Sequence, residues 1–164
     1  MNTGDFAAVA ITLYAAHHVG DYWVQTDEDA RDKGLPGTIG RLACLHHVVT
    51  YLFTQAAFLL VLSLTTGFRG GWWNVLGLAV SGLSHYAADR REHGLMFWLA
   101  RRLPVSGFLT LGRPRPYTTA ATAADNRGRE LSLDNPTLGT GAHALDQAWH
   151  IFFGVFVAAL VVTA

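Results

Sequence analysis

The sequence predicts an all-α fold, an integral membrane four-helix bundle, and this prediction comes from composition and from the length of its apolar stretches. Of the 164 residues, 51% are hydrophobic and only 15% are charged, whereas charged residues make up about 25% of a typical soluble domain. Four apolar stretches each approach the roughly 20 residues that a helix needs to cross a bilayer core. We therefore predict one domain, 1–164, with membrane spans over about 6–25, 42–66, 72–89 and 142–164.

The first stretch resembles a signal peptide in position only. It lacks a basic leading segment and begins near Asp5, so we predict that it is retained as a helix. A soluble four-helix bundle is the alternative fold. That fold requires polar outer faces, which the second and fourth stretches do not offer.

The connections between the spans differ in length and composition. Residues 26–41 form a polar loop with Gly and Pro, and the tight turn "TGFRGG" makes the second and third helices antiparallel neighbours. The long connection over 90–141 opens with "RREHGLMFWLARRL", whose apolar and basic residues suit a short helix in the membrane interface. It continues as a loop rich in Pro, Gly and Thr.

The basic residues predict how the bundle is oriented. The loops 26–41 and 90–140 hold eleven of the twelve Lys and Arg residues, so the positive-inside rule assigns both loops to the cytoplasm and both termini to the outside. The formal net charge is zero, and no nucleic-acid partner is expected. The predicted partner is the lipid bilayer, and a homo-oligomer is left open.

Histidine and aspartate recur at the cytoplasmic end of every predicted helix. Three His–Asp pairs are spaced i, i+4, which places both side chains of a pair on one helix face. In lipid such polar faces turn toward the bundle interior, so we expect them to converge. The predicted metal ligands are His17, Asp21, His47, His85, Asp89, Asp146 and His150.

A divalent metal ion accounts for this clustering better than a polar network does. Interhelical polar contacts in membranes contribute on average about 0.6 kcal/mol, little compensation for three carboxylates in a low dielectric. An ion favours deprotonated Asp and neutral His at the same place. Zinc is the first expectation, with manganese or iron also suited. Seven ligands exceed the four of one zinc site, so either two ions bind or some carboxylates orient histidines. A purely structural His–Asp network and a proton or ion pathway are the alternatives.

Further residues are candidates for catalysis and substrate binding. A carboxylate that is not a ligand would be the general base, which makes Asp21, Asp89 and Asp146 the catalytic candidates. Gln25, Lys33 and Gln147 are candidates for orienting a substrate. Arg90 and Arg91, with Lys33, could hold a phosphate above the metal, although the positive-inside bias explains them equally well. His18 and His46 point about 100° away from their neighbours on a helix and are expected outside the site.

Four ordered motifs carry a resemblance to a known family. They are "H-x-x-x-D-Y-x-V-Q-T-D" from His17, "H-V-V-T-Y" from His47, "S-H-Y-x-x-D-R-R" around His85 and "G-T-G-A-x-x-L-D-Q-x-W-H" ending at His150. In these the chain resembles the domain of unknown function family numbered 3307, small membrane proteins of bacteria and phages, and most of all its actinobacterial members. Many relatives carry a further His where this chain has Tyr51, so the resemblance implies a smaller ligand set here.

The resemblance and the residues together predict a function. The chain is expected in the bacterial inner (plasma) membrane as a metal-dependent hydrolase acting on a phosphoester or lipid head group at the cytoplasmic interface. The family's His/Asp pattern is similar to that of membrane proteins labelled metal-dependent hydrolases, which is an analogy. A non-enzymatic metal or ion carrier, and a structural or regulatory membrane protein held together by its metal, are the alternative functions.

Overall fold

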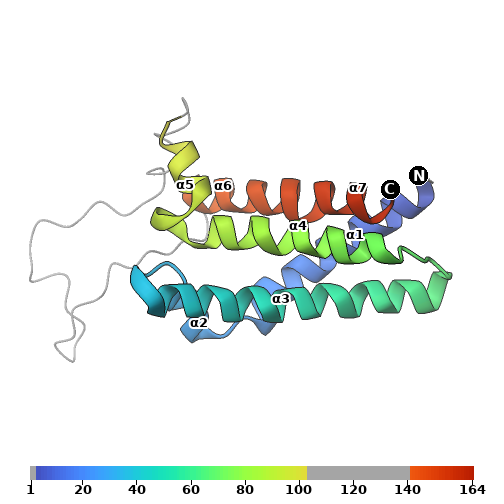
Figure 1. The fold of residues 1–164 in the computed structure, drawn as a ribbon, viewed down its shortest axis with the longest axis horizontal. Helices are drawn as coiled ribbons and strands as arrows, with labels where there is room; N and C mark the ends of the chain where they lie inside the picture. The colour runs from blue at the N-terminus through green and yellow to red at the C-terminus, as the bar shows by residue number, and fades with distance from the viewer. Residues whose placement is uncertain (1–2, 103–140) are drawn as a thin grey trace, which may run out of the picture. The chain divides into compact units, whose positions relative to one another are not determined.

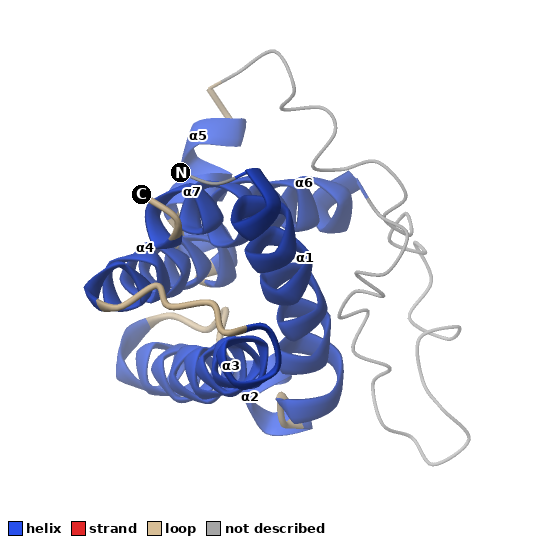
Figure 2. Ribbon diagram, turned by 90° about the vertical axis from the view of Figure 1, so that its right-hand side faces the viewer, coloured by secondary structure: helices blue, strands red, loops and turns tan. Residues whose placement is uncertain are grey.

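The computed structural model describes residues 3–102 and 141–164, and every regular element within these ranges is a helix (Figures 1 and 2). The all-α prediction is therefore confirmed. The part of the predicted loop that falls on 103–140 lies outside the described residues.

The chain up to Asp89 contains three long helices, one short helix and one π-helical turn. In chain order these are α1 (Thr3–Val19), which continues into the π-helical turn η1 (Gly20–Val24), then α2 (Asp27–Asp32), α3 (Gly37–Thr66) and α4 (Trp72–Asp89). The Thr26 side chain caps α2 by accepting a hydrogen bond from the Asp29 N–H at 3.1 Å. Helix α3 ends at Gly67, whose φ of 76° is a left-handed conformation that glycine adopts without strain.

The remaining elements follow α4 and close the chain. A short 3₁₀ turn η2 (Arg91–His93) leads into α5 (Leu95–Ala100). The last helix runs over Gly141–Val162 and consists of α6 (Gly141–Trp149), the π-helical segment η5 (His150–Val157) and α7 (Ala158–Val162). The interfacial helix predicted from residue 90 thus corresponds to η2 and α5.

The chain divides into two compact units, Met1–Leu99 with Asp146–Ala164, and Ala100–Leu145. In the first unit α1 packs on α3, and α4 packs on η5 and α7. The turn between α3 and α4 lies at the same end as both chain termini, and α2 lies at the opposite end (Figure 1). We call the end with the termini the outer end and the end with α2 the α2 end.

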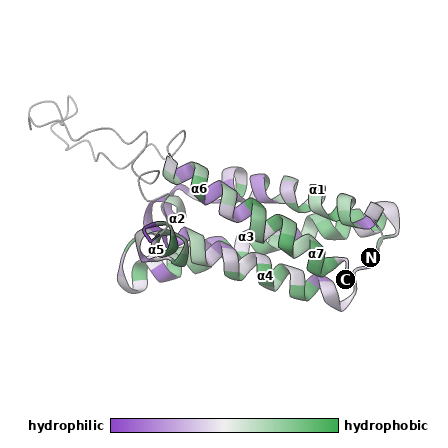
Figure 3. Ribbon diagram, turned by 90° about the horizontal axis from the view of Figure 1, so that it is seen from above, coloured by the Kyte–Doolittle hydropathy of each residue, from purple (hydrophilic) through white to green (hydrophobic). Residues whose placement is uncertain are grey.

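The two ends of this unit differ in the residues that they bury. An apolar core fills the part toward the outer end, and its buried members are Val9, Leu13, Leu59, Val155, Ala158, Ala159 and Val162. Polar residues gather toward the α2 end, as the hydropathy colouring shows (Figure 3). The fold therefore separates an apolar half from a half that buries polar groups.

Two of the described helices are long and apolar enough to cross a membrane, judged by length and composition alone. They are Gly37–Thr66 and Gly141–Val162. In their most apolar windows only 22% and 33% of the residues are buried inside the structure. Most residues of these two windows are thus at least partly accessible at the surface of the structure.

Candidate metal centre

The seven predicted ligands come together at the α2 end. They are contributed by α1 (His17), η1 (Asp21), α3 (His47), α4 (His85 and Asp89), α6 (Asp146) and η5 (His150). Three groups of side chains could each hold a metal ion, with ligand atoms within 4.8 Å of one another: His17, Asp21 and His85; His47, His85 and Asp89; and Asp89, Asp146 and His150. The groups share His85 and Asp89, so the seven side chains form one continuous cluster.

The centre of the cluster is a pair of imidazole nitrogens. Nε2 of His47 lies 2.9 Å from Nε2 of His85, and both lie 3.1 Å from Oδ2 of Asp89. Oδ1 of Asp21 is 3.5 Å from His47 Nε2 and 3.4 Å from His85 Nε2. Ligand bonds of about 2.0–2.1 Å in a tetrahedral zinc site place neighbouring ligand atoms about 3.3 Å apart. The observed separations are close to this value.

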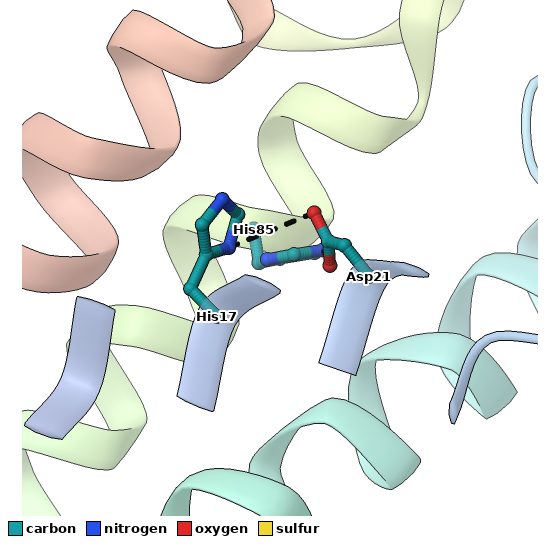
Figure 4. A group of neighbouring side chains, drawn as sticks. All are labelled: His17, Asp21 and His85. Carbon is teal, nitrogen blue, oxygen red and sulfur yellow. Dashed lines mark ion pairs between the residues drawn. The ribbon is translucent and has the colours of Figure 1, made fainter. Parts of the chain in front are cut away.

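His17 presents an unpartnered nitrogen to the cluster. Its Nε2 lies 3.2 Å from Oε1 of Gln147, an acceptor, so Nε2 carries the proton and Nδ1 has the lone pair. Nδ1 is buried without a hydrogen-bond partner and lies 3.6 Å from Oδ2 of Asp21. Figure 4 shows His17 and His85 beside the Asp21 carboxylate. A lone pair that faces a carboxylate requires a cation or a proton between them.

His150, at the start of η5, has the same arrangement as His17: one ring nitrogen is hydrogen-bonded and the other is unpartnered. Its Nδ1 donates to the backbone oxygen of Asp146 at 2.7 Å, which leaves the lone pair on Nε2. Nε2 is buried without a partner and lies 3.9 Å from Oδ1 of Asp89. Metal-binding histidines characteristically donate their second ring N–H to a carbonyl or carboxylate. The hydrogen bonds of His17 and His150 thus leave one nitrogen of each ring in the state that binds a metal ion, so the residues of this cluster fit such an ion.

The charges of the cluster also fit a divalent ion. Three carboxylates, those of Asp21, Asp89 and Asp146, face the single ammonium of Lys33, whose Nζ lies 2.9 Å from Oδ2 of Asp89. With neutral histidines two negative charges remain uncompensated in a largely buried site. Buried uncompensated charge is strongly unfavourable, and an ion of charge +2 would balance it.

Lys33 is held in place by its neighbours. Burial of the ammonium lowers the pKa of Lys33, but the charges of Asp89 and Asp21 outweigh burial and raise that pKa above its ordinary value. In the amide orientation that satisfies both groups of Gln25, its oxygen accepts from Lys33 Nζ at 2.8 Å and its nitrogen donates to the Asp21 backbone oxygen at 3.2 Å. Two of the predicted substrate residues thus lie directly beside the metal-ligand candidates, and the third, Gln147, contacts His17.

The segment 25–36, which we call the strap, is fastened to the end of α4. Arg90 donates from Nη1 to the Lys33 oxygen at 2.7 Å and from Nη2 to the Leu35 oxygen at 2.9 Å. Arg91 donates to the Ala30 oxygen at 2.9 Å. The structure thus gives Arg90 and Arg91 partners in the strap, and the interpretation that they hold a phosphate above the metal stays a prediction. Both bind backbone carbonyls and fix the strap that carries Lys33.

Two neighbouring histidines lie outside the cluster. His46 Nδ1 lies 2.7 Å from Oδ2 of Asp29 on α2, and the ring of His18 stacks on Tyr22. Sequence reasoning missed the pair of His46 and Asp29. The sequence gives only a weak signal for this contact, because seventeen positions separate the two residues and only the path of the strap brings them together.

A buried polar network supports the cluster from the side of the apolar core. The ring of Tyr51 packs against His85 with centroids 3.9 Å apart, and its hydroxyl accepts from Gln55 Nε2 at 2.8 Å. The hydroxyl also lies 3.3 Å from Oγ of Ser81, and Ser81 in turn donates to the Gly154 oxygen at 3.0 Å. Tyr51 therefore positions the His85 ring.

Replacing Lys33 should strengthen metal binding. The ammonium and a metal ion compete for the same carboxylate of Asp89, so Lys33→Met is expected to tighten zinc binding about tenfold. The measurement is zinc titration of the detergent-solubilised protein against a competing chelator. Arg31→Met is the matched control, because Arg31 is exposed and pairs with Asp32 on the same segment. Equal affinities in the three proteins would mean that Asp89 does not bind the ion.

No family model, curated protein or solved structure matches the chain. The resemblance to the family numbered 3307 therefore stays a prediction.

Proposed function

We propose that the chain is an integral membrane four-helix bundle whose His–Asp cluster binds one or two divalent ions, with zinc the leading candidate. We further propose that it hydrolyses a phosphoester or a lipid head group at the cytoplasmic interface. The observation that carries the proposal is the pair of buried, unpartnered imidazole nitrogens, Nδ1 of His17 and Nε2 of His150, beside carboxylates that outnumber the nearby cations.

The exposed apolar surface supports the membrane part of the proposal. Phe53 and Leu64 of α3 are 72% and 77% exposed, and such side chains along a 30-residue helix suit contact with lipid. The proposed topology has four spans over about 6–25, 42–66, 72–89 and 142–164, with the α2 end in the cytoplasm and both termini outside. In that topology the cluster lies at the cytoplasmic side of a bacterial inner membrane.

The arrangement of the chain's own groups supports hydrolysis. A divalent ion would supply water activation near neutral pH and polarisation of a phosphoryl oxygen. The side chain of Asp146 is 25% exposed, against 10% for Asp21 and 4% for Asp89. Asp146 is therefore the carboxylate that a water and a substrate can reach most easily, and we assign it the general base.

The proposed reaction uses the groups around Asp146. The oxygen of a water molecule attacks phosphorus, its proton passes to the Asp146 carboxylate, the ester P–O bond breaks, and the leaving alkoxide takes up a proton. Lys33 and Gln25 orient the phosphoryl oxygens through the ammonium and the amide. Asp21 and Asp89 remain as metal ligands or as partners of the histidines.

The buried residues favour an enzyme over a carrier. A carrier needs a polar path through the bundle. Among the described residues, the buried polar network ends at Gln55 and Ser81, and the core toward the outer end is made of Val, Leu and Ala. The cluster is thus open to one side of the proposed membrane only.

The test is the metal content of the detergent-purified protein by elemental mass spectrometry, with a His85→Ala, Asp89→Ala variant beside it. Stoichiometric zinc, manganese or iron in the wild type and its loss in the variant are expected, followed by release of alcohol from phosphoester substrates by the wild type alone. A wild type without metal, with stability unchanged in the variant, would leave a structural or proton-handling network instead.

A further inference from the structure

A second polar site lies beside the strap, between the start of α3 and the end of α4. A cavity of about 300 Å³ is lined by Pro36, Gly37, Arg41, Tyr86, Arg90 and His93. We call it the basic cavity, because three of its lining side chains, those of Arg41, Arg90 and His93, are basic. None of the described residues that line it carries an acidic side chain.

Two of the basic side chains in the cavity have no partner among the residues that the structure describes. The side chains of Arg41 and His93 are exposed, and neither makes a hydrogen bond or ion pair with the part of the chain that the structure describes. Arg90, in contrast, is buried and held by the carbonyls of Lys33 and Leu35. One fixed guanidinium and two free basic side chains thus surround one cavity.

The backbone adds to the positive character of this cavity. It opens at the first turn of α3, a 30-residue helix whose N-cap, Pro36, provides no side-chain hydrogen bond. The first N–H groups of a helix lack intrahelical acceptors and carry partial positive charge. Gly37 and Pro36 line the cavity at this point.

We infer that the basic cavity binds a phosphate group, as a site separate from the metal cluster. Guanidinium groups and helix N-termini are the usual protein partners of phosphate oxygens. The strap keeps the two sites apart, because the Lys33 carbonyl binds Arg90 while the Lys33 ammonium binds Asp89. The phosphate comes either from an anionic phospholipid or from inorganic phosphate, and both present the same tetrahedral oxygens.

The test uses the full chain in detergent with two probes. Native mass spectrometry measures retention of dioleoyl phosphatidylglycerol against dioleoyl phosphatidylcholine, and ³¹P line broadening measures binding of inorganic phosphate. The variant is Arg41→Ala, His93→Ala, which changes exposed side chains only. The control is Arg69→Ala, which removes an exposed arginine from the turn between α3 and α4, at the outer end.

Each outcome decides for or against the site. Preferential retention of phosphatidylglycerol that falls about tenfold in the double variant and not in Arg69→Ala supports a lipid phosphate. Binding of inorganic phosphate that falls in the same way, without a lipid preference, supports free phosphate. Equal binding in the double variant and the control would overturn the inference. The inference does not depend on the proposed function, because the metal content of the double variant reports on the cluster separately.

Discussion

Replacing His47 with alanine is expected to abolish metal binding, whereas replacing the adjacent His46 should leave it intact. His47 Nε2 lies 3.1 Å from Asp89 and 2.9 Å from His85 at the centre of the cluster. His46 instead faces Asp29 on α2. We expect zinc affinity to fall by more than about 100-fold in His47→Ala, measured by chelator competition, and phosphoester hydrolysis to be lost with it.

The two neighbours provide a matched pair for this experiment. Both lie in the same turn of α3, so each His→Ala substitution changes the helix propensity by the same amount, and a difference in metal content reflects the cluster. Circular dichroism of both variants checks that the helices remain. Metal retained in His47→Ala, or lost in both variants alike, would contradict the assignment of the central histidine pair.

Replacing Asp146 with asparagine should separate catalysis from metal binding. The amide keeps the size of the side chain but cannot take up a proton from water. We expect kcat for phosphoester hydrolysis to fall about 100-fold while the metal content stays at the wild-type level. The backbone oxygen of Asp146, which accepts from His150 Nδ1, is unaffected by the substitution.

The control for this variant is Asp32→Asn, which changes a carboxylate on α2 that pairs with exposed Arg31. Its kcat should equal that of the wild type. Loss of metal from Asp146→Asn would assign this carboxylate to the ion and transfer the role of base to Asp21 or Asp89. An unchanged kcat in Asp146→Asn would contradict the role as base directly.

The pairwise spacing of the candidate site could be predicted because it depends on helix geometry alone. His17 with Asp21, and His85 with Asp89, are one turn apart and stay on one face in a helix of any environment. The prediction that these pairs lie at one end of a bundle needed only the lengths of the apolar stretches and the short turn between α3 and α4. For His47, the position of the partner helices decided which of two adjacent histidines faces inward.

The contacts across the strap could not be predicted, because they depend on the path of a polar segment. Lys33 and Asp89 are 56 positions apart, and no periodicity links a loop residue to a helix end. The double hydrogen bond from Arg90 to strap carbonyls involves backbone groups, which carry no sequence signal. Charge counting predicted that Arg90 belongs to a cytoplasmic loop, yet it gave no sign of the hydrogen bonds by which Arg90 holds the strap.

The last helix changes its pitch directly beside the cluster. The π-helical segment η5 begins at His150 and buries His150, Gly154 and Val155. A π-helical turn holds more residues than an α-helical turn, and π-helical turns are frequent at functional sites. The segment therefore has the character of an insertion into an otherwise regular helix.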